Sequence, residues 1–292
     1  MWRPARHATE RESWTCAVLG IVVVGLFLAM SAYAEEPMIV AHRGASKHAP
    51  ENTIPAFERA WQQGADAIEG DFHLTKDGHI VCIHDGNTKR VSNANVVIRD
   101  TSLAELRKLD VGAYRGEEFR GTTIPTMGEV FATIPEGKKI YIEIKCGSEI
   151  IPALLREIDN SGLTKDQVVV ISFNEKVLQK LKAQASEYKV SWLCSFKKND
   201  SDEVTPSLKK VLDTLKRIQA DAFSSNTAVP HAVTKAVQQR GYEYHVWTVD
   251  DIKTARRFKE WGAKSITTNV PGLIRENLVE QDAAADTPKP RR

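Results

Sequence analysis

Seven polar residues lie at the ends of apolar, β-branched runs, at four places in the chain, and their types suit acid–base and metal chemistry. They are His42 and Arg43 after MIVA, Glu69 and Asp71 in AIEGDFHL, His84 in HIVCIHD, and Glu143 and Lys145 in KIYIEIK. Side chains alternate between the two faces of a strand, so residues two apart share a face. If the four runs are parallel barrel strands, their carboxyl ends converge and all seven side chains meet in one pocket.

The three acidic residues of this set, Glu69, Asp71 and Glu143, predict a site for a divalent cation. Carboxylates that lie close together raise one another's pKa unless a cation sits among them. Oxygen ligands of this kind suit Mg²⁺ or Ca²⁺, with water or substrate completing the coordination. We therefore expect a divalent metal cofactor, Ca²⁺ or Mg²⁺, and the sequence does not choose between them.

The basic residues of the set predict an anionic substrate such as a phosphate ester. Arg43 and Lys145 supply fixed positive charge for a phosphate group. His42 and His84 can supply a general base and a general acid. Together with a metal ion, these groups predict a metal-assisted phosphodiesterase.

Each residue alone has a simpler interpretation, since a Glu-x-Asp pair is usually a solvated strand edge and a single histidine is usually a hydrogen-bonded core residue. The coincidence of four strand ends favours a functional site. The other histidines lack such a pattern, and we assign structural or surface positions to His48, His73, His79, His231 and His245. The GxGxxG, GxxxxGK[ST], GxSxG and HExxH motifs are absent from the sequence, which argues against nucleotide cofactors, serine hydrolases and zincins.

Strand-like runs alternate with helical patterns, which predicts βαβ units and a mostly parallel sheet. The strand candidates are Met38–His42, Ala67–Phe72, His79–His84, Lys139–Lys145, Gln167–Ser172, Lys189–Cys194, Asp221–Ser224, Tyr244–Val249 and Ser265–Thr268. The helix candidates are Pro55–Gln63, Met127–Ile134, Ile150–Asn160, Glu175–Ser186, Ser207–Gln219, Ala232–Arg240 and Ile252–Trp261. This order favours an α/β fold, a (β/α)₈ TIM-type barrel, with an open doubly wound sheet as the alternative. Nine strand candidates compete for eight places, and we expect the short Ser265–Thr268 to be the one outside the barrel.

The connection from Gly86 to Pro125 is too long for an ordinary loop. It holds 40 residues, of which only Leu103–Leu109 looks helical. Long connections in compact domains are usually functional, so we expect a small insertion at 86–125, after the third strand and over the strand ends. The predicted barrel domain spans residues 35–280, and the tail 281–292 has the composition of a disordered segment.

The N-terminus has the pattern of an export signal. Three arginines precede an apolar or glycine run of 15 residues from Cys16 to Met30, followed by Ala32-Tyr33-Ala34. This run is shorter than the ~20 residues of a membrane-spanning helix, so we expect residues 1–34 to be a signal peptide cleaved after Ala34. The mature protein would then be periplasmic or secreted, with no stable membrane span. An uncleaved anchor helix is the alternative.

The composition is that of a globular protein with a balanced charge. Hydrophobic residues make up 42% and charged residues 27%, and 40 basic against 38 acidic residues give a net charge of +2. This balance argues against a partner such as nucleic acid that is bound through bulk charge. After cleavage three cysteines remain, Cys82, Cys146 and Cys194, which allow one disulfide or none. The oligomeric state stays open.

The segment AHRGASKHAPENTIPAFERAWQQGADAIEGDFHLTKDGHIVCIHD resembles the glycerophosphodiester phosphodiesterase family nearly throughout. Further similar segments are YIEIK, ISFN and VWTVD, so the resemblance spans Ile39 to Pro271. It implies that His42 and His84 are the general acid/base pair and that Glu69, Asp71 and Glu143 hold the metal. It also assigns to the substrate site Arg43, Lys145, Glu51, Phe173 and Trp247.

Two residues depart from the pattern of that family. Asp250 stands where the family usually has Asn, and Asn269 stands where it usually has Asp. Because Asp250 precedes a predicted helix, we expect it to cap that helix, as Asn would. We expect neither departure to touch the seven central residues.

The resemblance implies hydrolysis of a small-molecule glycerophosphodiester to sn-glycerol 3-phosphate and an alcohol. We expect His42 to deprotonate the attacking oxygen and His84 to protonate the departing alkoxide. The attacking oxygen is that of water or of the neighbouring glycerol hydroxyl. Two alternatives stay open: a lysophospholipase D or sphingomyelinase D-like enzyme acting on larger lipids, and a catalytically silent exported binding protein.

Overall fold

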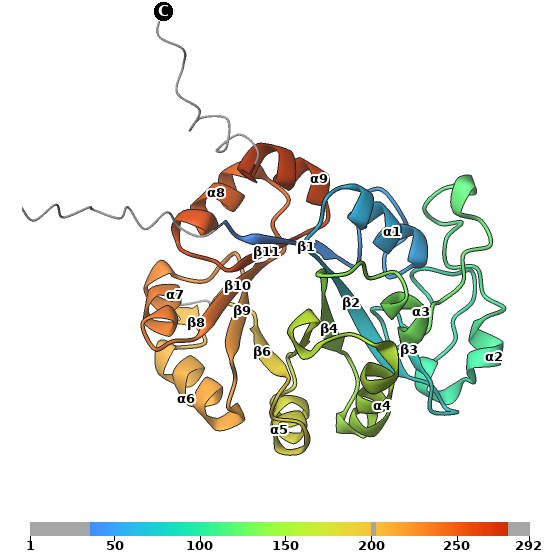
Figure 1. Ribbon diagram of the computed structural model, residues 1–292, viewed down its shortest axis with the longest axis horizontal. Coiled ribbons are helices and arrows are strands. Elements are labelled where there is room, and N and C mark those ends of the chain that lie inside the picture. The colour runs from blue at the N-terminus through green and yellow to red at the C-terminus, as the bar shows by residue number, and fades with distance from the viewer. Residues whose placement is uncertain (1–35, 200–202, 280–292) are drawn as a thin grey trace, which may run out of the picture. The chain divides into compact units, whose positions relative to one another are not determined.

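The computed structural model describes residues 36–199 and 203–279, and they form a barrel of parallel strands surrounded by helices (Figure 1). The predicted signal peptide (1–34) and tail (281–292) lie outside the described residues. Eight strands make the barrel: β1 Met38–His42, β2 Ala67–Leu74, β4 Lys139–Ile144, β5 Val168–Ser172, β6 Lys189–Cys194, β9 Ala222–Asn226, β10 Glu243–Trp247 and β11 Ser265–Thr268. The barrel closes because β1 pairs with both β2 and β11. The predicted (β/α)₈ fold is thus confirmed, and the open sheet is excluded.

Helices follow the strands and cover the outside of the barrel. They are α1 Ile54–Gln62, α3 Met127–Phe131, α4 Ile151–Ser161, α5 Glu175–Gln184, α6 Leu208–Ile218, α7 His231–Gln238, α8 Ile252–Glu260 and α9 Pro271–Ile274. Short 3₁₀ turns at Ser148–Ile150 and Lys165–Gln167 lead into α4 and β5, and a π-helical turn at Arg275–Val279 follows α9.

Helix α6 illustrates why these segments are helical. Val211, Leu215 and Ile218 are buried and fall on one face at helical spacing, with lysines and arginine on the other. The Ser207 side chain caps the N-terminus by accepting a hydrogen bond from the backbone N–H of Lys210. The buried face packs in the layer between the helices and the strands, which holds the largest hydrophobic cluster of the described residues.

One expectation about the strands is wrong. Ser265–Thr268 is barrel strand β11, fully buried and paired with β1 and β10. The strand outside the barrel is β3, Ile80–Cys82, which pairs antiparallel with β2. Only five residues separate Leu74 from Ile80, too few for the crossover that a parallel neighbour needs, so the chain turns back as a hairpin. Gly78, with φ of +84°, lies in this turn.

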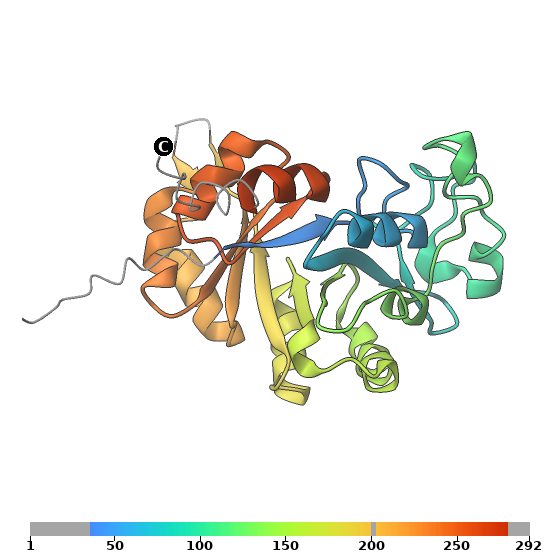
Figure 2. The same ribbon diagram turned by 45° about the horizontal axis from the view of Figure 1, so that its top comes forward.

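The predicted insertion follows β3 and lies beside the barrel (Figure 2). It contains the 3₁₀ turns Ile98–Asp100 and Glu117–Phe119 and the helix α2 Leu103–Leu106, which is shorter than the expected 103–109. It has a hydrophobic cluster that it shares with β3: Val81, Ile83, Val91, Ile98, Leu106, Val111 and Ile124. The insertion is therefore a small subdomain with its own packed side chains and not an extended loop.

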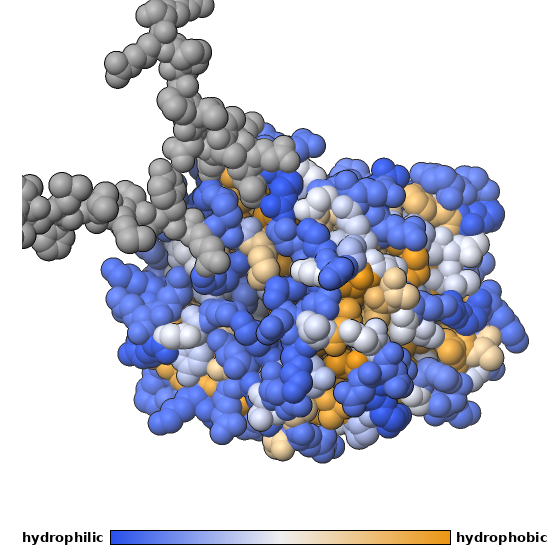
Figure 3. Space-filling view, viewed as in Figure 1, coloured by the Kyte–Doolittle hydropathy of each residue, from blue (hydrophilic) through white to orange (hydrophobic). Residues whose placement is uncertain are grey.

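A second short hairpin, β7 Lys197–Lys198 with β8 Val204–Thr205, follows β6. The surface seen in Figure 3 is mostly hydrophilic, with smaller hydrophobic areas between polar residues. Across the described residues, no helix is both long enough and apolar enough to cross a membrane.

Candidate active site

The carboxyl ends of the barrel strands surround a cavity of about 270 Å³. Eight of the ten residues predicted from the sequence line it: His42, Arg43, Glu69, His84, Glu143, Lys145, Phe173 and Trp247. The other two contact the lining residue Arg43. Asp71 is fully buried behind the cavity, 3.0 Å from Arg43 Nε, and Glu51 Oε1 accepts a hydrogen bond from Arg43 Nη1 at 3.0 Å.

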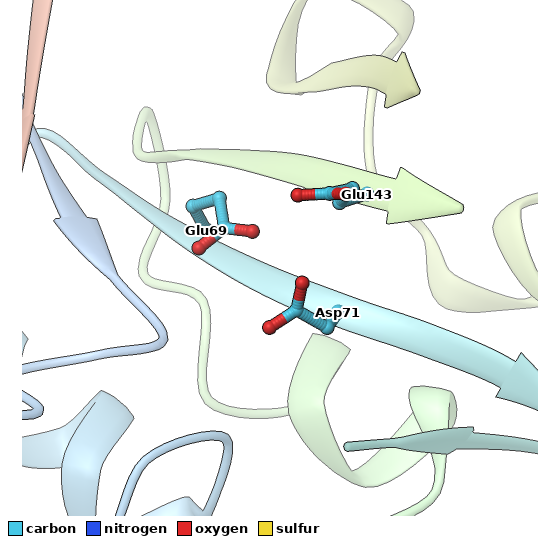
Figure 4. Close-up of side chains that lie close together, drawn as sticks. All are labelled: Glu69, Asp71 and Glu143. Atoms are coloured by element: carbon cyan, nitrogen blue, oxygen red, sulfur yellow. The ribbon is translucent and has the colours of Figure 1, made fainter. Parts of the chain in front are cut away.

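The three carboxylates come together because of the register of β2 and β4. Asp71 stands opposite Glu143 in this parallel pair, and Glu69 is two residues before Asp71 on the same face. Each of the three offers a carboxylate oxygen, and these oxygens lie within 4.8 Å of one another. Figure 4 shows Glu69 and Asp71 on β2 and Glu143 on the neighbouring β4, with their carboxylates gathered between the strands.

Burial and mutual repulsion make this cluster of carboxylates unfavourable without a cation. Burial, together with the charges of Asp71 and Glu143, raises the pKa of Glu69 well above its ordinary value. Burial and the charge of Asp71 raise the pKa of Glu143 to about 7. Burial would also raise the pKa of Asp71, but the nearby Arg43 and Lys145 hold it below its ordinary value.

The unused lone pairs of the cluster fit a metal ion. Glu69 Oε1 and Asp71 Oδ1 are buried and accept no hydrogen bond within the described ranges, although Asp71 Oδ1 lies 3.4 Å from Lys145 Nζ. A buried carboxylate oxygen without a donor is costly. Three carboxylate oxygens at this separation are the ligands that a hard divalent cation prefers. The cluster could therefore hold such an ion.

Arg43 is held from three directions. Its backbone N–H donates to Glu69 Oε2 at 2.9 Å, and its guanidinium contacts Asp71 and Glu51. The following Gly44 has φ of +79°, and a Cβ there would lie 2.5 Å from the carbonyl carbon of Ala56. The HRG motif thus needs glycine at its third position so that the loop can pack against the first turn of α1.

His84 is oriented by a chain of charged groups. Its Nδ1 lies 2.7 Å from Asp85 Oδ1, and Asp85 Oδ2 accepts a hydrogen bond from Arg90 Nε at 2.9 Å. Arg90 also donates two hydrogen bonds to Glu51, at 2.7 and 2.8 Å, and Glu51 in turn contacts Arg43. This chain connects His84 to Arg43 through a residue of the insertion, Arg90.

His84 reaches the cavity by a different route from the one expected. We expected HIVCIHD to be a parallel barrel strand that ends at the cavity. Instead, β2 extends beyond the barrel and β3 runs back along it, and the backbone N–H of Ile83 donates to the carbonyl of Asp71. His84 therefore arrives beside the buried carboxylates from the opposite direction.

His42 has an amide as its partner. Its Nδ1 lies 2.8 Å from Asn269 Oδ1, which follows β11. Burial and the adjacent charge of Arg43 lower the pKa of His42 to about 4. The expectation that neither family departure touches the central residues is therefore wrong, because Asn269 contacts His42 directly.

Asp250 does not cap a helix as expected. The cap of α8 is the next residue, Asp251, whose side chain accepts a hydrogen bond from the backbone N–H of Thr254 at 2.8 Å. Asp250 instead contacts Asn269, accepting from its side-chain Nδ2 at 2.7 Å and from its backbone N–H at 2.8 Å.

One wall of the cavity is apolar. Phe173 and Trp247 meet edge to face with ring centroids 5.6 Å apart, and Ile171 and Leu193 lie beside them. Phe173 is 45% exposed, which is unusual for a side chain of its size and places an apolar surface at the cavity. The Trp247 Nε1–H is buried and has no acceptor in residues 36–199 or 203–279.

We expected structural or surface positions for the remaining histidines, but His245 also lines the cavity. His245 is buried in the barrel with Nδ1 2.8 Å from Ser265 Oγ, and His73 Nε2 lies 3.2 Å from the backbone carbonyl of His84. Of the two alternatives for the cysteines, the structure has no disulfide, since all three cysteines of the described residues are free: Cys82, Cys146 and Cys194.

Sequence reasoning missed the residues that orient the site. Asn52 holds Asp71 by donating to its Oδ2 at 2.8 Å and accepting from its backbone N–H at 3.1 Å. Asp85 and Asn52 were within reach of the sequence, because each directly follows a residue already singled out, His84 and Glu51. Nothing local in the sequence indicates the role of Arg90.

Comparisons with known proteins agree with this geometry. Residues 42–273 match the glycerophosphoryl diester phosphodiesterase family. The chain is 34% identical over 256 residues to a glycerophosphodiester phosphodiesterase of Caldanaerobacter subterraneus subsp. tengcongensis, covering 84% of this chain and 98% of that protein. It is also 25% identical to lysophospholipase D GDPD1 of Mus musculus, covering 82% of this chain and 85% of that protein.

A solved structure with a similar fold carries a product. A phosphodiesterase of Oleispira antarctica in complex with the product sn-glycerol-3-phosphate superimposes with a TM-score of 0.76 and 27% identity, over 84% of this chain and 98% of that chain. The glycerophosphodiester phosphodiesterase of Thermotoga maritima is similar, with a TM-score of 0.66 and 25% identity over 82% of this chain and 97% of that chain. The sequence match, the barrel and the residues around its cavity lead to one conclusion: this chain belongs to the glycerophosphoryl diester phosphodiesterase family and is a phosphoric diester hydrolase.

Proposed function

We propose that the protein hydrolyses glycerophosphodiesters to sn-glycerol 3-phosphate and an alcohol, with a bound divalent cation and a His42/His84 acid–base pair. The observation that carries this proposal is that both histidines line one cavity with Glu69 and Glu143, and that the buried Asp71 completes the carboxylate cluster behind it. A related protein, that of Oleispira antarctica, is known in complex with sn-glycerol-3-phosphate, which supports the choice of product.

Glu69, Asp71 and Glu143 would hold the cation, either Mg²⁺ or Ca²⁺. The raised pKa values of Glu69 and Glu143 support this assignment, because burial and the neighbouring carboxylate charges raise them, and a bound cation would stabilise the ionised forms against both effects. When bound, such an ion supplies Lewis-acid stabilisation of charge on phosphoryl oxygens.

Arg43 and Lys145 bind the phosphate in this proposal. Both side chains line the cavity, and contacts with Asp71 raise the pKa of each despite its burial, so both stay positively charged. Arg43 is fixed by Glu51 and can therefore present its guanidinium without losing much side-chain entropy on binding. Phe173 and Trp247 form the apolar wall against the glycerol or the leaving group.

The partners of the two histidines support a division of their roles. His42 is buried beside a neutral amide and has a pKa of about 4, so it is an unprotonated base at neutral pH. His84 Nδ1 lies 2.7 Å from Asp85 Oδ1, and this carboxylate fixes the orientation of the ring that would donate the proton. His42 takes the proton of the attacking oxygen as that oxygen bonds to phosphorus, the phosphorus–oxygen bond to the alcohol breaks, and His84 gives its proton to the departing alkoxide. If the glycerol hydroxyl attacks, this step leaves a cyclic phosphate, and water must then open it to give glycerol 3-phosphate. The attacking oxygen is that of water or of the neighbouring glycerol hydroxyl.

A second candidate is hydrolysis of lysophospholipids at the same bond. The exposed apolar ring of Phe173 at the cavity and the similarity to lysophospholipase D GDPD1 of Mus musculus favour it. This activity would use the same catalytic groups and differ only in what contacts the apolar wall.

One experiment tests the function and separates these candidates. Metal-free enzyme receives Mg²⁺ or Ca²⁺ in turn, and release of glycerol 3-phosphate from glycerophosphocholine is compared with headgroup release from lysophosphatidylcholine. We expect turnover of glycerophosphocholine, restored by one of the two ions after chelation. Full activity after exhaustive chelation would exclude the metal role, and turnover of lysophosphatidylcholine alone would favour the second candidate.

We also propose export, with cleavage after Ala34. The basic start and the apolar run of the N-terminal segment support this. N-terminal sequencing of the mature protein tests it, and we expect Glu35 as the first residue.

A further inference from the structure

A line of hydrogen bonds connects His42 to a carboxylate that does not itself touch the histidine. His42 Nδ1 lies 2.8 Å from Asn269 Oδ1, and Asn269 Nδ2 lies 2.7 Å from Asp250 Oδ2. The other oxygen of Asp250 accepts from the backbone N–H of Asn269 at 2.8 Å and from Thr268 Oγ1 at 3.1 Å. Asp250 is exposed, so it acts here through hydrogen-bond geometry more than through its charge.

The direction of these hydrogen bonds is fixed by their chemistry. A carboxylate can only accept, so the group of Asn269 that faces Asp250 must be the donating NH₂. The amide oxygen of Asn269 then faces His42, and it can only accept. The hydrogen of the imidazole therefore sits on Nδ1, and Nε2 is left with a free lone pair.

We propose that Asn269, oriented by Asp250, is a positioning residue that holds His42 in the tautomer with hydrogen on Nδ1. This inference rests on the general-base role proposed for His42, since only that tautomer leaves Nε2 able to take a proton. Ser46 does not choose between the two orientations, because its single hydroxyl hydrogen can go to Asn269 Oδ1 at 2.7 Å or to the backbone carbonyl of His42 at 2.8 Å.

The opposite orientation of the amide is disfavoured by contacts on both sides. Turning it by 180° would place its oxygen against Asp250 Oδ2 at 2.7 Å, where two acceptors repel. It would also present NH₂ to His42, which would then carry its hydrogen on Nε2. Asp250 thus selects the tautomer of a histidine with which it has no contact of its own.

Exchanging the side chains of Asp250 and Asn269 distinguishes an orienting role of their hydrogen bond from a role in packing alone. In Asp250→Asn the amide of Asn269 loses its fixed direction, and in Asn269→Asp two carboxylates face each other. The double variant Asp250→Asn with Asn269→Asp restores a donor opposite an acceptor and keeps an acceptor for His42. We expect each single variant to lose about tenfold in kcat with little change in KM, and the double variant to return to within about threefold of the original.

The tautomer itself is read by ¹⁵N NMR of histidine-labelled protein, with the His42 signal assigned by its loss in His42→Gln. We expect hydrogen on Nδ1 in the original protein and in the double variant, and a substantial population with hydrogen on Nε2 in Asp250→Asn. The matched control is Asp251→Asn, which changes the neighbouring carboxylate that caps α8, and it should leave both kcat and the signal unchanged.

Two results would overturn the inference: an unchanged His42 tautomer in Asp250→Asn, or a double variant no more active than the weaker single variant. If Asn269→Asp does not fold, Asp250→Asn carries the test, because its side chain is exposed. Failure of the proposed function gives a different result. Normal turnover by His42→Ala would refute the base role, whereas the tautomer shift in Asp250→Asn would still be seen.

Discussion

His84 and Asp85 are neighbours in the sequence, and their side chains also contact each other at 2.7 Å. Adjacent residues on a strand point to opposite faces, so this contact exists only because the chain leaves β3 before His84. Asp85 is in turn held by Arg90. The proposed general acid therefore has a support held by an ion pair, and this support does not depend on the substrate.

Loss of the proposed general acid gives the first prediction at this scale. Replacing His84 with Ala should lower kcat for glycerophosphocholine by about 10²–10⁴, the usual contribution of a positioned acid or base. Steady-state kinetics measure the effect, with His79→Ala as the control because His79 is an exposed histidine of the same hairpin. Unchanged turnover by the His84 variant would refute the assignment.

The sequence predicts which side chains line the cavity better than it predicts the partners of those side chains. Glu69 and Asp71 can be identified from spacing alone, because a two-residue interval on a strand fixes a common face. Asn269 cannot be found in this way, since it lies 227 residues from His42 in the chain and meets it only when β11 pairs with β1. Partners brought together by barrel closure leave no local pattern.

At the scale of elements, the loop between β1 and α1 leads to the second prediction, which concerns the stability cost of a side chain at Gly44. A Cβ on Gly44 would lie 2.5 Å from the backbone of Ala56, and φ there is +79°. Gly78 has a similar φ of +84° but open space around it. We expect Gly44→Ala to reduce the free energy of unfolding by about 2–4 kcal/mol, because it adds a backbone clash to the strain. Gly78→Ala should cost only about 1 kcal/mol.

Urea denaturation of the two alanine variants measures this difference. Because Gly44 follows Arg43, we also expect its variant to bind phosphate more weakly, whereas Gly78→Ala should bind it normally. Equal destabilisation of the two would contradict the packing argument.

The wrong choice of the strand that lies outside the barrel has a physical cause. Ser265–Thr268 looked like a weak strand because it is short, yet its four residues are all buried and pair with β1 and β10. The length of the connection before β3 was the better guide, since a hairpin of five linking residues cannot return as a parallel strand. The length of the connection therefore indicates whether a strand is a parallel barrel strand or half of a hairpin, which strand propensity alone does not tell.

At the scale of the whole molecule, a buried histidine makes stability depend on pH. Burial lowers the pKa of His245 to about 4, from an ordinary value of 6.5. Between these values the unfolded chain binds a proton that the folded chain does not, so stability falls as the pH falls through this window. We expect His245 to make the folded state about 2 kcal/mol less stable at pH 5 than at pH 7.

Chemical denaturation at the two pH values tests this. On going from pH 7 to pH 5, His245→Gln should lose about 2 kcal/mol less stability than the original protein, because the shifted pKa values of His42, Glu69 and Glu143 act equally in both proteins. His79→Gln is the control, since His79 is exposed. The same slope in all three proteins would show that His245 does not control the acid limit of stability.

The contacts of Arg90 have a consequence for rebuilding this barrel. Arg90 belongs to the insertion, yet it neutralises both Glu51 and Asp85, which support the proposed phosphate-binding residue and the proposed general acid. A shortened or transplanted linker in place of residues 86–125 would have to bring a guanidinium to the same spot. Otherwise Asp85 would lose its arginine and Glu51 would keep only Arg43, and redesign of the loop would disturb catalysis even where no loop atom meets the substrate.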